Sequence, residues 1–123
     1  MNNDTKQFND PETGDVLRFH VGAFKKLISG IIAKYLNKSE QEAISMVDNH
    51  NLFSKPIQTF GDAIFFSHEP EYHWAMLIAY GESYWLKGIP SDPPEGYDEW
   101  ESAYIAQHHL PSSSFEWLSD DQI

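Results

Sequence analysis

The sequence predicts a mainly α-helical fold, a compact single domain of four or five helices. Three observations support this fold class. Apolar side chains recur every three or four residues over residues 22–37, as one face of a helix requires. Residues typical of helix N-terminal caps precede several other segments. Hydrophobic residues make up 41% of the 123 residues, which is enough for one core.

Residues 1–15 are expected to form a flexible N-terminal arm, and residues 16–123 a single globular domain. The arm is polar and carries two turn signals, Asn9-Asp10-Pro11 and Thr13-Gly14-Asp15. Further along the chain, no segment is repeated and none has the composition of a linker. We therefore expect one folding unit.

Residues 22–37 are the clearest helix. Gly30 lies within it at a cost of up to about 1 kcal/mol relative to alanine, which predicts close packing against another helix at that point. The apolar stripe of this helix consists of Phe24, Leu27, Ile28, Ile31, Ile32, Tyr35 and Leu36.

A second helix is predicted over residues 39–49, because Ser39 and Glu42 have the spacing of a capping box. Two consecutive helices are also typical of DNA-binding proteins. This helix begins without arginine or lysine, on which base recognition depends, so we exclude that function. A short helical turn is expected between Ser54 and Phe60.

The apolar residues 70–80 are predicted to form a central helix. Pro70 suits its first turn and Gly81 suits its C-terminal cap. We expect Trp74, Leu77 and Ile78 to be buried. The alternative is a strand paired with residues 63–66, which would give a small two-stranded β element near residues 63–80. Periodicity alone does not decide a short run that is apolar throughout.

The last helix is predicted to begin at Asp92, with Asp92 as its N-cap and Pro93 in its first position. Its apolar face would hold Tyr97, Trp100 and Tyr104, and Pro111 would prevent its continuation. The tail that follows contains Phe115-Glu116-Trp117-Leu118. We expect these aromatic residues to pack back on the domain, because an exposed apolar segment of this kind favours aggregation.

The absence of cysteine excludes disulfides, thiolate catalysis and cysteine-based metal sites. The N-terminal residues lack the apolar core of a signal peptide, and no apolar run reaches the roughly 18 residues that a membrane span needs. We expect a soluble, cytoplasmic protein that does not bind membranes.

Acidic charge is confined to the second half of the chain. Residues 1–56 carry seven acidic and seven basic side chains, whereas residues 57–123 carry twelve acidic ones and a single basic one, Lys87. Such a surface repels nucleic acid phosphates and anionic lipids, which bind to lysine and arginine clusters. It attracts a basic protein.

No motif for catalysis, metal or cofactor binding is complete. The segment His68-Glu69-Pro70-Glu71-Tyr72-His73 resembles the HExxH motif of metalloproteases, but its second histidine is one residue too far along. No nucleophile elbow or glycine-rich phosphate loop is present. We predict no bound metal and no cofactor.

These observations predict a non-catalytic acidic binding protein that masks a basic protein partner, such as a bacterial immunity protein or antitoxin that neutralises a toxin. The partner-binding residues would be Asp92, Glu95, Tyr97, Asp98, Glu99, Trp100 and Glu101. One alternative is a scaffold that self-associates through an aromatic face. Another is a small enzyme or ligand-binding domain with a pocket formed by His68, Glu69, Tyr72 and His73.

Overall fold

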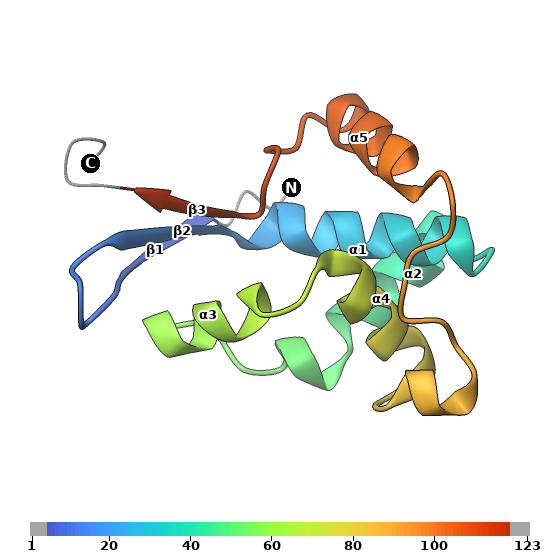
Figure 1. Ribbon diagram of the computed structural model, residues 1–123, viewed down its shortest axis with the longest axis horizontal. Coiled ribbons are helices and arrows are strands. Elements are labelled where there is room, and N and C mark those ends of the chain that lie inside the picture. The colour runs from blue at the N-terminus through green and yellow to red at the C-terminus, as the bar shows by residue number, and fades with distance from the viewer. Residues whose placement is uncertain (1–4, 119–123) are drawn as a thin grey trace.

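Helix α1 (Val21–Tyr35) runs through the centre of the computed structural model, which describes residues 5–118 (Figure 1). Most of its predicted apolar stripe is buried: Phe24, Ile28, Ile31 and Ile32 are fully enclosed, whereas Tyr35 and Leu36 at its end are half-buried. Four further α-helices surround it: α2 (Glu40–Asp48), α3 (Phe60–Ser67), α4 (Glu71–Tyr80) and α5 (Tyr97–Gln107). The mainly α-helical fold class is thereby confirmed.

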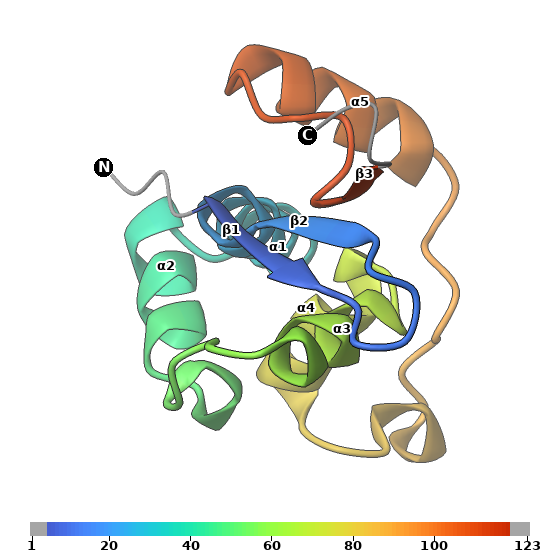
Figure 2. The same cartoon turned by 90° about the vertical axis from the view of Figure 1, so that its left-hand side faces the viewer.

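A three-stranded antiparallel sheet lies at one end of the molecule (Figures 1 and 2). Its strands are β1 (Thr5–Asn9), β2 (Val16–His20) and β3 (Phe115–Leu118), in the order β1-β2-β3. Strand β2 continues directly into α1, so the sheet is fixed to the central helix. Phe19 of β2 and Phe115 of β3 stack with ring centroids 4.4 Å apart, which joins the sheet to the core.

The positions of the strands and helices correct two predictions. Residues 5–9 form strand β1, so the expected flexible arm is wrong for this part; residues 1–4 lie outside the described residues. β1 shows no alternation of apolar and polar residues, and only its pairing with β2 makes it a strand. The alternative two-stranded β element near residues 63–80 is also wrong, since α3 and α4 occupy that segment.

Helix α4 replaces that strand alternative because both of its ends carry helix-terminating signals. Pro70 is its N-cap and Gly81, at φ +94°, ends it. Trp74 is buried as expected and its indole N–H donates to the carbonyl of Phe66 at 3.1 Å. Leu77 and Ile78 are only half-buried, contrary to expectation, because the buried side of α4 is formed by Tyr72, Trp74, Ala75 and Met76.

Two helix boundaries also differ from prediction. The short helical turn η1 lies at Asn51–Phe53 rather than after Ser54. Its N-terminus is capped by the ring of His50, which accepts a hydrogen bond from Leu52, and sequence rules do not anticipate a histidine cap. Helix α5 begins at Tyr97 instead of Asp92, because Gly96 has a left-handed conformation with φ +88° that no helix continues through.

The capping box of α2 and the close approach at Gly30 are confirmed. The Ser39 hydroxyl accepts from the Glu42 backbone N–H at 3.1 Å, and the Glu42 carboxylate accepts from the Ser39 N–H at 3.3 Å. A Cβ atom at Gly30 would overlap the ring of Tyr104. Gly30 is therefore the position at which α5 packs closely on α1.

Candidate functional site

The predicted partner-binding residues divide into buried aromatics and exposed carboxylates. Tyr97 is buried, and its ring lies 5.2 Å from that of Tyr72 and 6.0 Å from that of Tyr35, measured between centroids. Trp100 is half-buried against Tyr35. These aromatic rings hold α5 on α1 and α4. The side chains that remain exposed to a partner are Asp92, Glu95, Asp98 and Glu99.

Glu101 lies half-buried beside other carboxylates. Burial raises the pKa of Glu101, and the nearby charges of Glu71 and Asp98 raise it further. The Tyr97 hydroxyl donates to Glu101 Oε2 at 2.8 Å, which opposes part of this rise in the pKa. We call Glu71, Asp98 and Glu101 the acidic cluster. Its members come from the first turn of α4 and the first two turns of α5.

Glu71 is also fixed in place by the chain's C-terminal segment. The Ser114 hydroxyl, which is buried, donates to Glu71 Oε2 at 2.8 Å. Burial raises the pKa of Tyr97, followed by the hydrogen bond to Glu101 and the charges of Glu101 and Glu71, so this hydroxyl stays a hydrogen-bond donor. The acidic cluster is thus held by hydroxyl donors and contains no positive charge among the described residues.

Ion pairs within residues 5–118 all involve basic residues of the first half of the chain: Arg18 and His20 with Glu116, Lys25 with Asp48, and Lys26 with Glu40. Nine carboxylates lie between residues 57 and 115: Asp62, Glu69, Glu71, Glu82, Asp92, Glu95, Asp98, Glu99 and Glu101. None of these nine is in an ion pair within the described part of the chain. Apart from Glu116, the carboxylates of the second half that the structure describes are therefore not offset by ion pairs with the basic residues of the first half.

The alternative pocket residues are not gathered around one cavity. His68 and Glu69 are exposed, whereas Tyr72 is buried in the core. His73 Nδ1 lies 3.0 Å from the hydroxyl of the fully buried Tyr84, so it serves as a core hydrogen-bond partner. Of the four residues, Tyr72 lines a small cavity of about 290 Å³ together with Tyr35, Tyr80 and Asp92.

A larger groove, of about 880 Å³, lies elsewhere, between the start of α1, helix α2 and the segment that follows α5. Three of the six histidines line it: His20, His108 and His109. Lys25 and Lys26 line it as well. No sequence signal predicted this groove, because its histidines come from distant segments that only the fold brings together.

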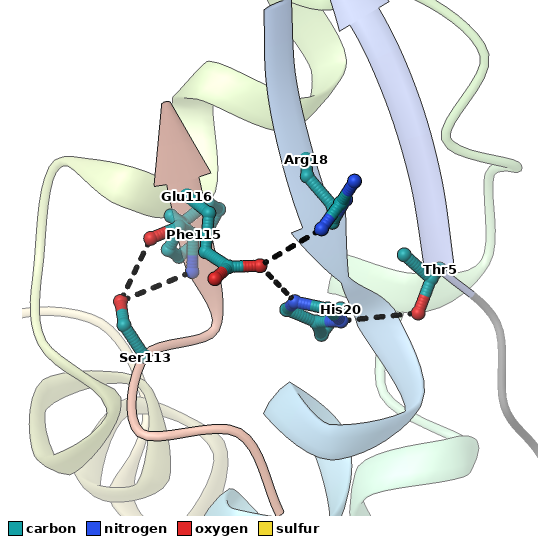
Figure 3. A network of polar contacts seen from close by, with 6 residues as sticks. All are labelled: Thr5, Arg18, His20, Ser113, Phe115 and Glu116. Atoms are coloured by element: carbon teal, nitrogen blue, oxygen red, sulfur yellow. Dashed lines mark hydrogen bonds and ion pairs between the residues drawn. The ribbon is translucent and has the colours of Figure 1, made fainter. Parts of the chain in front are cut away.

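A polar network spans the three strands at one wall of this groove (Figure 3). Thr5 Oγ1 lies 3.1 Å from His20 Nδ1, and His20 Nε2 donates to Glu116 Oε1 at 2.7 Å. Arg18 also contacts Glu116, at 3.6 Å. The hydrogen bond from His20, followed by the charges of His20 and Arg18, lowers the pKa of Glu116. A hydroxyl, an imidazole and a carboxylate in this order can activate the hydroxyl oxygen as a nucleophile. The same contacts also link β1, β2 and β3.

Among the described residues no three histidine, aspartate or glutamate side chains are close enough together to hold a metal ion. None of the helices in that part of the chain is sufficiently long and apolar to cross a membrane. No family model, curated protein or solved structure matches this chain.

Proposed function

We propose that this protein is a non-catalytic binding protein whose acidic second half masks a basic protein partner. One observation carries the proposal: the nine carboxylates between residues 57 and 115 have no ion-pair partner within the described chain. A bacterial immunity protein or antitoxin that covers a cationic toxin in the cytoplasm is the kind of protein that has such a surface.

The acidic cluster gives this proposal a contact site. Glu71 and Glu101 are both half-buried, and the charge of Glu71 makes ionisation of Glu101 less favourable. An arginine or lysine side chain from a partner would reverse this effect, because an opposite charge nearby favours the ionised carboxylate. Arginine could also form paired, charge-assisted hydrogen bonds there. The exposed Asp92, Glu95 and Glu99 would attract the partner and accelerate its association.

The proposal is tested by capture from lysates of the source cells on three immobilised proteins. These are the wild type, the triple variant Asp98→Asn/Glu99→Gln/Glu101→Gln, and the control triple variant Asp10→Asn/Glu12→Gln/Asp15→Asn. Both variants lose three negative charges, but the control substitutions lie in the turn between β1 and β2, where these three carboxylates form no ion pair within the described residues. We expect the wild type and the control to retain the same basic protein, to lose it as salt rises, and the first triple variant to retain little of it.

Two results would contradict this function. One is that no basic protein is retained at low salt. The other is that the two triple variants retain it equally, which would mean that total charge matters and the location of the charge does not.

The second candidate function is a small enzyme that uses the Thr5–His20–Glu116 network at the edge of the 880 Å³ groove. Its test is reaction with a fluorophosphonate. The Thr5 O–H bond would break as the oxygen bonds to phosphorus, the proton would pass to His20, and fluoride would leave with the P–F electron pair. A mass increase of one phosphonate per chain, lost in both Thr5→Val and His20→Gln, would favour this enzyme over the binding protein.

A further inference from the structure

Two large apolar side chains are exposed on the short 3₁₀ helix η2 (Tyr84–Lys87). Trp85 is 48% exposed and Leu86 is 78% exposed. One side of the Trp85 ring packs on His73 and Tyr84, with ring centroids 6.2 Å and 5.1 Å away. Single exposed apolar residues are common on protein surfaces, but an adjacent tryptophan and leucine form a larger apolar patch. We call Trp85 and Leu86 the apolar pair.

The backbone around the apolar pair is held in one conformation. Ser83 has a left-handed backbone with φ 56°, uncommon for a residue other than glycine, and Gly81 and Gly88 on either side also have positive φ. Between them Tyr84 is fully buried, and its hydroxyl lies 3.0 Å from His73 Nδ1. Lys87 Nζ donates to the Tyr80 carbonyl at 3.2 Å. A buried anchor and an unusual turn thus present the apolar pair rigidly.

The charges near the apolar pair select among its binding partners. Glu82 is exposed immediately before the turn, and Lys87, which follows the apolar pair directly, is exposed and donates to the Tyr80 carbonyl. Burial, and after it the charge of Glu69, raises the pKa of Tyr84, the residue before the apolar pair. Two carboxylates therefore outnumber one ammonium group in this region. A second copy of this chain has a net charge of −11 and would be repelled, as would an anionic membrane. A basic protein would be attracted.

The apolar pair and the acidic cluster are connected by one loop. Residues 88–96 lead from η2 to the first turn of α5, and both views show this loop running along one side of the molecule, with η2 and α5 at its two ends (Figures 1 and 2). Nine residues span at most about 30 Å. An interface of ordinary size, about 800 Å² per partner, covers a region of that extent.

We infer that Trp85 and Leu86 are the apolar anchor of the interface with the basic partner, and that this partner offers an apolar recess bordered by lysine or arginine. This inference rests on the proposed function and adds the residues that provide most of the affinity. Tryptophan is enriched among such residues, and rigid presentation avoids the entropy cost of ordering a loop on binding. The carboxylates around the anchor then determine attraction and orientation.

The experiment uses two fluorescently labelled 14-residue peptides as probes, with lysines at identical positions. One carries leucine and the other serine at the remaining positions, arranged at helical spacing. Binding is measured by anisotropy for the wild type, for Trp85→Gln/Leu86→Gln, and for the control Trp117→Gln/Ile44→Gln. The control removes a tryptophan that is 49% exposed and an isoleucine that is 38% exposed, on other elements.

We expect the wild type and the control to bind the leucine peptide about tenfold or more tightly than the serine peptide, since two apolar side chains become buried. Trp85→Gln/Leu86→Gln should bind both peptides equally, with a far-ultraviolet circular dichroism spectrum like that of the wild type. Equal binding of both peptides by the wild type, or an equal loss of preference in the control, would overturn the inference while leaving the proposed function intact. Failure of both peptides to bind at low salt would contradict the proposed function itself.

The two other partners have their own readouts. Sedimentation of the wild type as a dimer that Trp85→Gln/Leu86→Gln converts to a monomer would replace the basic partner with a second copy of the chain. Binding to phosphatidylserine vesicles that the same variant abolishes would replace it with a membrane. Either result overturns the inference. A wild-type protein that sediments as a monomer and does not bind the vesicles supports it.

Discussion

Gly30 shows how one residue fixes the position of two helices. Because it has no side chain, the ring of Tyr104 lies directly against the backbone of α1, and the Tyr104 hydroxyl donates to the Lys26 carbonyl at 3.3 Å. Burial of this ring raises the pKa of Tyr104 to about 12, so the hydroxyl remains a donor under all physiological conditions. The position of α5, and with it the acidic cluster, depends on this contact.

We predict that Gly30→Ala destabilises the protein by about 1–3 kcal/mol, because the added methyl group overlaps the Tyr104 ring. The better helix propensity of alanine offsets up to about 1 kcal/mol of this. Urea unfolding measures the difference. The control is Gly61→Ala in α3, where the nearest atom is Thr59 Oγ1 at 3.7 Å, and it should be neutral or slightly stabilising. Equal stability of the two variants would show that α5 does not pack on Gly30.

Glu101 yields a prediction about pH. Its pKa is raised in the folded protein, so the folded state binds more protons than the unfolded state between the ordinary pKa of 4.5 and the raised value. Stability should therefore fall as pH rises through that window. We expect Glu101→Gln to melt at a higher temperature than the wild type at pH 7. The difference should disappear below pH about 4, where Glu101 is protonated in the folded and in the unfolded protein. A lower melting temperature at pH 7 would mean that Glu101 is already neutralised by another group.

Signals between residues close in sequence predicted which segments are helices. They predicted less well where those helices begin and end. The stripe of α1, the capping box of α2 and the helical state of α4 follow from spacing and caps, and the structure confirms them. The start of α5 was wrong because Gly96 ends any helix that Asp92 could have begun. Burial within α4 was partly wrong, since a run apolar throughout does not indicate which side faces the core.

Helix α4 provides the test at this scale. Met76 is 2% exposed, whereas its neighbour Leu77 is half-buried. Met76→Ala should cost about 2–5 kcal/mol of unfolding free energy, as core truncations do, and Leu77→Ala should cost clearly less. Denaturant unfolding of both variants measures this order. The reverse order would mean that α4 is rotated about its axis.

At the scale of the whole molecule, the contacts that sequence reasoning missed are those between distant segments. Strands β1 and β3 come from opposite ends of the chain and pair with β2 between them, and neither has a strong strand signal of its own. For the same reason the groove lined by His20, His108 and His109 was not foreseen. The acidity of the second half was readable as composition, but the meeting of Glu71 with Glu101 required the packing of α5 beside α4.

The nine carboxylates between residues 57 and 115 form no ion pair within residues 5–118, and we propose that they favour a basic partner for this reason. The most direct test is the melting temperature of the isolated protein in sodium chloride from about 10 mM to about 300 mM, over which the screening length falls from about 30 Å to below 8 Å. We expect the melting temperature to rise with salt in the wild type and in Asp10→Asn/Glu12→Gln/Asp15→Asn. In Asp98→Asn/Glu99→Gln/Glu101→Gln the rise should be smaller, because part of the repulsion is already absent. A melting temperature that falls with salt, or that rises equally in all three proteins, would contradict the claim.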